Sequence, residues 1–233
     1  MIMVHNRNWG SQENLFILVT VIILFIGIIL VPARIHAEST FFSLSKGMSG
    51  PQVSELQRNL QELGFFKYPS ITGYFGVVTK QAVEDFQLAY GLRATGMVDE
   101  SSQTAIAHAV VKQDMMSNAL RYIGVPYRWG GTTPVSGFDC SGFVYFMFQS
   151  HGISMSRTTS SQLFTMGVPV ERSLLQPGDL VFFSMSISGQ VSHVGFYLGD
   201  GKFISALSSK GIYIQSLNTV YWGSRYLGAK RVY

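Results

Sequence analysis

The chain contains a single cysteine, Cys140, which is therefore its only sulfur nucleophile. Asp139 precedes it and can cap a helix that begins there, so we expect the thiol in the first helical turn. Unpaired backbone N–H groups and the positive end of the helix dipole favour a thiolate at such a position, which predicts a pKa below about 8.5. The N–H groups of Cys140 and Ser141 could also hold a developing oxyanion. The alternative is a small buried hydrophobic residue.

A thiolate needs a base, and His193 is the best candidate for that role. It lies inside Val191–Leu198, a predicted strand with apolar neighbours. A polar ring in such a strand needs a partner, which the thiol of Cys140 would supply. The alternative is a core histidine with an unrelated partner. The other histidines are expected in the N-terminal segment, in the first domain, or at the far end of the Cys140 helix: His5, His36, His108 and His151.

The elements around these two residues change from helices to strands along residues 114–233. A predicted helix over Asp114–Ile123 is followed by a glycine-rich turn, the Cys140 helix and a loop. From Asp179 onward, short strands alternate with glycine turns: DLVFFSM, VSHVGFYLG, KFISAL, GIYIQ and RYLGAKRVY. Helices followed by strands predict an α+β domain with an antiparallel sheet.

Residues 44–111 predict a separate, smaller helical domain. Apolar residues recur at steps of three and four in Gly50–Phe65, which indicates one buried helical face. A similar helix is predicted over Gly76–Gly91, and a third short helix after Val98. This pattern resembles the three-helix peptidoglycan-binding module of bacterial wall enzymes, through LQRNLQELGF, GYFGVVTKQAVEDFQ and GLRATGMVD. The resemblance implies wall binding; the alternative is a helical hairpin that only packs on its neighbour.

Residues 114–233 resemble the papain-like cysteine peptidases of the NlpC/P60 family. The resemblance is carried by PYRWGG, FDCSGFV, SRTTSSQ, PGDLVFF and SHVGFYLGDGKFI, in that order. It implies cleavage of an amide bond in cell-wall stem peptides, usually between D-γ-glutamate and a diamino acid. By resemblance Cys140 is the nucleophile and His193 the base. The same resemblance places four further residues at the substrate cleft: Tyr127, Trp129, Asp139 and Ser141.

One departure from the family concerns the third polar residue, usually a histidine, twelve positions after the base. Here that position is Ser205, whose hydroxyl is short and uncharged. Either Ser205, a water or a backbone carbonyl orients His193. The alternative function is therefore a wall-binding protein of the same fold with weak or lost catalysis. A second difference is that Thr158 and Thr159, not an acidic residue, follow the loop arginine Arg157, so we expect a stem peptide still attached to glycan as the substrate.

Composition excludes several other classes of protein. One cysteine rules out a disulfide scaffold and a four-cysteine zinc site. No HExxH motif is present, so we expect neither a metal nor a cofactor. The net charge of +4 arises without a run of lysine or arginine, so we expect no nucleic-acid partner. Peptidoglycan, through its stem peptide and glycan, is the expected partner.

The N-terminal segment predicts export. Leu15–Val31 holds 17 residues without a charge, between the lengths typical of a signal peptide and of a spanning helix. Ile35-His36-Ala37 offers a cleavage site, so residues 1–37 are expected to be a signal peptide or a membrane anchor. Either form places the rest of the chain outside the cell or in the wall, with membrane contact only through an uncleaved segment.

Overall fold

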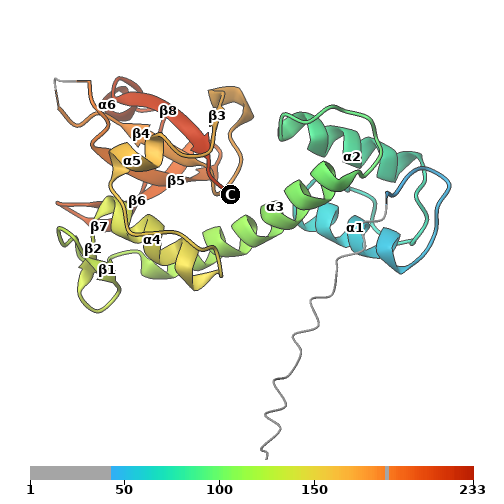
Figure 1. The fold of residues 1–233 in the computed structure, drawn as a ribbon, viewed down its shortest axis with the longest axis horizontal. Coiled ribbons are helices and arrows are strands. Elements are labelled where there is room, and N and C mark those ends of the chain that lie inside the picture. The colour runs from blue at the N-terminus through green and yellow to red at the C-terminus, as the bar shows by residue number, and fades with distance from the viewer. Residues whose placement is uncertain (1–42, 187–188) are drawn as a thin grey trace, which may run out of the picture. The chain divides into compact units, whose positions relative to one another are not determined.

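The computed structural model describes residues 43–186 and 189–233 (Figure 1). The predicted leader, residues 1–37, lies outside this range and stays a prediction. Within the described range, no helix is long and apolar enough to cross a membrane.

The first domain is a small helical module built from α1 (Pro51–Glu62), α2 (Val77–Ala89) and the first half of α3 (Glu100–Ala119). Pro51 occupies the first position of α1, where its missing N–H costs nothing. Asp99 caps α3 by accepting a hydrogen bond from the N–H of Ser102 at 2.8 Å. The apolar faces of the helices pack into one core, which includes Val53, Leu60, Phe75, Val83, Phe86 and Ile106.

Two buried glutamines hold this module together in the same way. Gln57 in α1 is 0% exposed and Gln87 in α2 is 1% exposed. Each amide oxygen accepts the N–H groups of a Thr-Gly pair in the loop after its helix, at 2.9–3.0 Å: Thr72-Gly73 for Gln57 and Thr95-Gly96 for Gln87. Each amide nitrogen donates to a hydroxyl in the next helix at 2.9 Å, to Thr79 and Ser102 respectively. The module is therefore an internal repeat whose two loops have the same polar frame.

The helix α3 spans the boundary between the two predicted domains, where the sequence predicted two separate helices. It runs without interruption through residues 111–114, so the predicted separate helix over Asp114–Ile123 is wrong. Only a short 3-10 turn, Leu120–Tyr122, follows it. Two buried charges and one half-buried charge tie α3 to the sheet. The carboxylate of Asp179 accepts from Arg231 at 2.9 and 2.8 Å, and the ammonium of Lys112 lies 3.9 Å from the same carboxylate.

The second domain is α+β, as predicted, with a six-stranded antiparallel sheet of order β3-β8-β4-β5-β6-β7. Five strands correspond to predicted ones: β4 (Leu180–Phe183), β5 (His193–Gly199), β6 (Lys202–Leu207), β7 (Gly211–Ser216) and β8 (Tyr226–Arg231). The sequence pattern did not predict the edge strand β3 (Val168–Val170), the short hairpin of β1 (Thr132–Thr133) and β2 (Gly137–Phe138), or the small helices α5 (Ser160–Phe164) and α6 (Val220–Gly223). A second 3-10 turn covers Arg172–Leu174.

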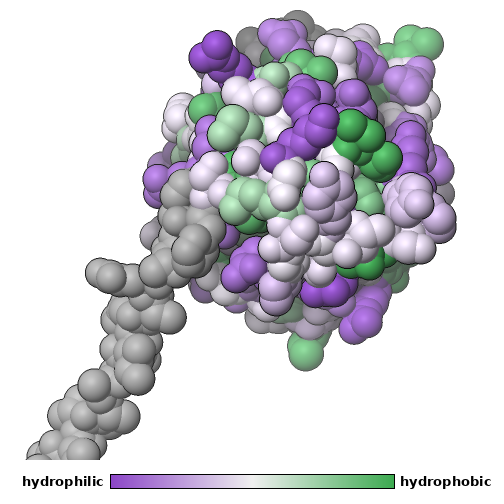
Figure 2. All heavy atoms as spheres, turned by 90° about the vertical axis from the view of Figure 1, so that its right-hand side faces the viewer, coloured by the Kyte–Doolittle hydropathy of each residue, from purple (hydrophilic) through white to green (hydrophobic). Residues whose placement is uncertain are grey.

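The helix α4 (Cys140–Ser150) packs on one face of this sheet, beside β5 and β6 (Figure 1). Its apolar residues join those of the sheet in a core that includes Phe143, Met147, Phe196 and Ile204. The other face carries a second cluster, with Phe183, Phe203, Leu217 and Trp222. On the face of the molecule shown in Figure 2, hydrophobic residues lie among hydrophilic ones. Because α4 and β5 share a core, the start of the helix and the start of the strand are held in fixed positions.

We predict that Gln87→Met lowers the free energy of unfolding by about 2–3 kcal/mol, because the part-buried N–H of Thr95 and the buried N–H of Gly96 lose their acceptor. Urea unfolding measures this. Gln81 on the same helix is exposed and bonds only Asp85, so Gln81→Met is the matched control, expected within about 0.5 kcal/mol of the parent. Equal effects of the two substitutions would contradict a structural role for the buried glutamine.

Candidate active site

Cys140 lies in the first turn of α4, as predicted, and Asp139 is the N-cap. The Asp139 carboxylate accepts the N–H of Gly142 at 2.6 Å and the hydroxyl of Ser141 at 3.2 Å. Its second oxygen accepts the N–H of Gly130 at 2.8 Å. Asp139 therefore fixes both the helix start and the glycine-rich turn that precedes it.

Glycine is required where this turn lies against α4. A Cβ added at Gly142 would lie 2.0 Å from the carbonyl oxygen of Gly131, and one at Gly131 would lie 2.3 Å from that of Gly137. Gly137 itself has φ +94°, a conformation that side chains disfavour. The glycines thus let two backbone segments approach closely enough to hold Cys140 at the cavity wall.

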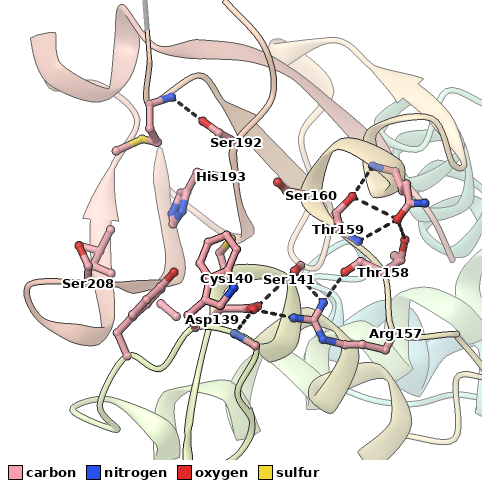
Figure 3. Close-up of a pocket in the computed structure, with 17 residues that line it drawn as sticks. Asp139, Cys140, Ser141, Arg157, Thr158, Thr159, Ser160, Ser192, His193 and Ser208 are labelled. Atoms are coloured by element: carbon pink, nitrogen blue, oxygen red, sulfur yellow. Dashed lines mark hydrogen bonds and ion pairs between the residues drawn. The ribbon is translucent and has the colours of Figure 1, made fainter.

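His193 begins β5 and lies on the same cavity as Cys140. The cavity has a volume of about 670 Å³, and both residues line it. Figure 3 shows His193 and Cys140 on its wall, from the sheet and from the helix respectively. The backbone N–H of Val194, the residue after His193, acts to lower the pKa of the Cys140 thiol. The residue predicted as base and the residue predicted as nucleophile therefore meet at one site.

Ser205 in β6 holds the buried side of the imidazole. Its hydroxyl lies 2.9 Å from Nε2 of His193, and it is 0% exposed. The ring of Trp222 from α6 stacks on the imidazole, with centroids 5.6 Å apart and 28° between the planes. Since Nε2 faces Ser205, Nδ1 is the ring nitrogen that remains to take a proton from a reacting group.

Burial disfavours the charged forms of both His193 and Cys140. It lowers the pKa of His193 to about 4. Burial also raises the pKa of the Cys140 thiol, and the charge of Asp139 adds to this rise. The N–H groups of Val194, Ser141 and Cys140 act in the opposite direction but do not outweigh burial. The lowered thiol pKa expected from the helix position is therefore wrong, because burial outweighs the N–H groups at the helix start.

Arg157 adds the one guanidinium to the residues that line this cavity. It donates to Asp139 at 2.6 Å and to the hydroxyl of Ser141 at 2.8 Å (Figure 3). Its side chain is 32% exposed, so it is both fixed in place and open to a ligand. The cavity is thus lined by Cys140 and His193 together with the ion pair of Arg157 and Asp139.

Both domains of the chain match known protein families. The sequence profile of the NlpC/P60 family matches residues 124–231, and the profile described as a putative peptidoglycan binding domain matches residues 49–106. Murein DD-endopeptidase MepS/Murein LD-carboxypeptidase of Escherichia coli is 39% identical over 148 residues, 60% of this chain and 77% of that protein. The chain belongs to the NlpC/P60 family.

Other relatives of this NlpC/P60 protein are longer than the part that matches. Murein DD-endopeptidase MepH of Escherichia coli is 43% identical over 50% of this chain and 44% of its own length. Gamma-DL-glutamyl hydrolase of Bacillus subtilis is 34% identical over 72% of this chain and 44% of its own length. The chain thus covers less than half of the length of each of these two relatives. A crystal structure of an NlpC/P60 family protein from Bacillus cereus has 38% identity and a TM-score of 0.48, covering 52% of this chain and 40% of that one.

All four residues predicted at the substrate cleft of the NlpC/P60 domain line the cavity: Tyr127, Trp129, Asp139 and Ser141. Trp129 is 87% exposed at the rim, whereas Asp139 is almost fully engaged by its hydrogen bonds. Ser205 lies behind His193 and does not line the cavity. His151 points away, as predicted, and its Nδ1 bonds the carbonyl oxygen of Met147 at 2.7 Å.

The sequence assigned no role of their own to three residues that the structure places at this site: Arg157, Trp222 and Gln215. Arg157 carried a signal, because it is the lone charge in the SRTTSSQ motif. Trp222 belongs to a helix of four residues, too short to show a periodic pattern. Gln215 hydrogen-bonds Ser205 from the neighbouring strand β7, a contact that only the strand register reveals.

We predict that the acid limb of kcat/KM has an apparent pKa near 4. Protonated His193 cannot accept the thiol proton, so activity falls as pH falls through the lowered pKa and not through 6.5. Initial rates on solubilised wall peptides between pH 3.5 and 8 measure this. NMR titration of the imidazole in Cys140→Ala is the control, because it removes coupling to the thiol. Loss of half the activity near pH 6.5 would contradict the neutral pair.

Proposed function

We propose that this chain is an exported peptidoglycan endopeptidase that cuts an amide bond in cell-wall stem peptides. The observation that carries the proposal is the meeting of Cys140 and His193 on one cavity of about 670 Å³. Membership of the NlpC/P60 family and the peptidoglycan-binding match of residues 49–106 support it. Relatives named as murein and peptidoglycan endopeptidases support a location in the cell wall.

The reaction follows from the uncharged pair. As the sulfur of Cys140 attacks the amide carbonyl, its proton passes to Nδ1 of His193, so charge develops only in the transition state. The N–H groups of Cys140 and Ser141 lie at the start of α4, where they can stabilise the oxyanion. The C–N bond then breaks as His193 returns the proton to the leaving amine. Water, deprotonated by His193, hydrolyses the thioester and frees the thiol.

The bond we assign is the one between D-γ-glutamate and the diamino acid. Its γ-linked glutamate has a free α-carboxylate, and Arg157 presents a guanidinium in the cavity that suits such a group. Relatives differ in the bond that their names state, as DD-endopeptidase and as gamma-DL-glutamyl hydrolase. No acidic residue follows Arg157 to bind a free peptide amine, which favours a stem peptide that is still attached to glycan.

The helical module is assigned the role of holding the enzyme on the wall. It has a hollow of about 350 Å³ lined by four exposed apolar or aromatic residues, Tyr68, Tyr74, Val77 and Val78. The equivalent positions of the second repeat carry Met97, Glu100 and Ser101 in place of Tyr74, Val77 and Val78. The shared glutamine frame does not require the exposed aromatic residues of the first repeat, so we assign them to contact with sugar rings of the glycan.

Cys140→Ala tests the assigned chemistry. We predict that it folds like the parent and releases no stem-peptide fragments from purified sacculi, because no other sulfur nucleophile exists. Mass spectrometry of the products identifies the bond cut by the parent. His151→Ala is the control, since that histidine lies outside the cavity and should retain full activity. Fragment release by Cys140→Ala at the parent rate would overturn the mechanism.

Tyr74→Ser tests the assigned binding hollow. We predict about a tenfold weaker binding of the full chain to sacculi, measured by co-sedimentation in the Cys140→Ala background so that no wall is digested. Met97→Ser is the matched control at the equivalent loop position and should bind like its parent. Equal binding of all three proteins would contradict a role for this hollow.

The alternative is a wall-binding protein of the same fold that has lost catalysis, as the serine at position 205 first suggested. The 2.9 Å contact between Ser205 and Nε2 of His193 favours the enzyme, because the serine does reach the ring. Binding to sacculi with no thiol-dependent digestion would favour the alternative.

A further inference from the structure

The side chain of Gln215 continues the line of polar groups that begins at His193. Its amide nitrogen donates to the hydroxyl oxygen of Ser205 at 3.1 Å and to the carbonyl oxygen of Tyr213 at 3.1 Å. The three side chains come from three adjacent strands, His193 from β5, Ser205 from β6 and Gln215 from β7. Ser205 is paired with Tyr213 across β6 and β7, so Gln215 reaches it diagonally.

A glycine makes room for this line of contacts. A Cβ added at Gly195 would lie 2.9 Å from the Cβ of Ser205 and 2.7 Å from the carbonyl oxygen of Ile204. Gly195 follows His193 by two residues on β5, on the same face of the strand. Any larger residue there would push Ser205 away from its neighbours. The backbone is therefore shaped to hold a short hydroxyl between the imidazole and the amide.

The environment of Gln215 argues against a purely structural role. Its amide oxygen is buried and has no hydrogen-bond partner among the described residues. A buried acceptor without a partner costs about 1–3 kcal/mol, and an apolar side chain at this position would avoid that cost. The benefit that remains is the pair of hydrogen bonds donated by the amide nitrogen.

We infer that Gln215 is a positioning residue, which acts through Ser205 to hold His193 in the orientation and tautomer needed for proton transfer. The amide N–H occupies one lone pair of the Ser205 oxygen, and the second lone pair accepts Nε2–H of His193. With the ring proton kept on Nε2, Nδ1 is free to accept the proton of Cys140. Ser205 and Gln215 together thus take the place of the single larger residue that is usual in this family.

This inference rests on the proposed peptidase chemistry, and a double-mutant cycle tests it with two readouts. The variants are Ser205→Ala, Gln215→Met and the double variant; methionine has a similar length but cannot donate. The first readout is the alkylation rate of Cys140 by iodoacetamide at pH 7, which reports its deprotonation without any substrate. Because the chain has one cysteine, the mass shift reports only this residue. The second readout is kcat and KM on wall peptides.

We expect Gln215→Met to lower kcat and the alkylation rate about 5–10-fold, with KM unchanged, as for the loss of one positioning hydrogen bond. In the Ser205→Ala background the same substitution should change neither rate, because the link to His193 is already broken. Tyr213→Phe, an exposed side chain on the same strand, is the matched control and should match the parent.

The inference would be overturned if the rate reductions caused by Ser205→Ala and Gln215→Met multiplied in the double variant. It would also be overturned if Gln215→Met changed only KM or only the unfolding midpoint. If the parent released no wall peptides, the proposed function would fail. The alkylation cycle would still decide whether Gln215 acts on the Cys140–His193 pair, so the two failures are distinguishable.

Discussion

The site depends on a buried, uncharged imidazole whose buried nitrogen has a fixed partner. His193 is 6% exposed, and removal from water disfavours its charged form. Burial also raises the pKa of the Cys140 thiol, so the charged form of that group is disfavoured as well. The contact to Ser205 and the stacked ring of Trp222 fix the ring on its buried side and on one face.

Most of the structure around this pair fixes the positions of Cys140 and His193. Asp139 and the glycines of the preceding turn fix the start of α4, and the shared apolar core fixes β5 against that helix. The guanidinium of Arg157 is held by Asp139, so the residue that caps the nucleophile helix also places the positive charge of the cavity. One carboxylate thereby couples the position of the nucleophile to that of the proposed substrate anchor.

Sequence reasoning worked where local pattern decides structure. It found the strands from β4 to β8 and the cap at Asp139, because strand alternation and helix capping are local signals. It failed where contacts between residues far apart in the sequence decide the structure. The separate helix over 114–123 was wrong because α3 continues through it, and a low thiol pKa was wrong because burial outweighs the helix terminus. Gln215 and Trp222 reach the site only through register and a short helix.

The central claim is that the sulfur of Cys140 bonds to the substrate acyl group while His193 moves the proton. Acid quenching during turnover of a purified wall peptide, followed by peptide mapping in a mass spectrometer, tests this most directly. The account predicts a thioester on the peptide that contains Cys140, with the mass of the acyl half of the substrate, which disappears when substrate is exhausted. Full turnover with no adduct at any time, or an adduct on a different residue, would contradict it.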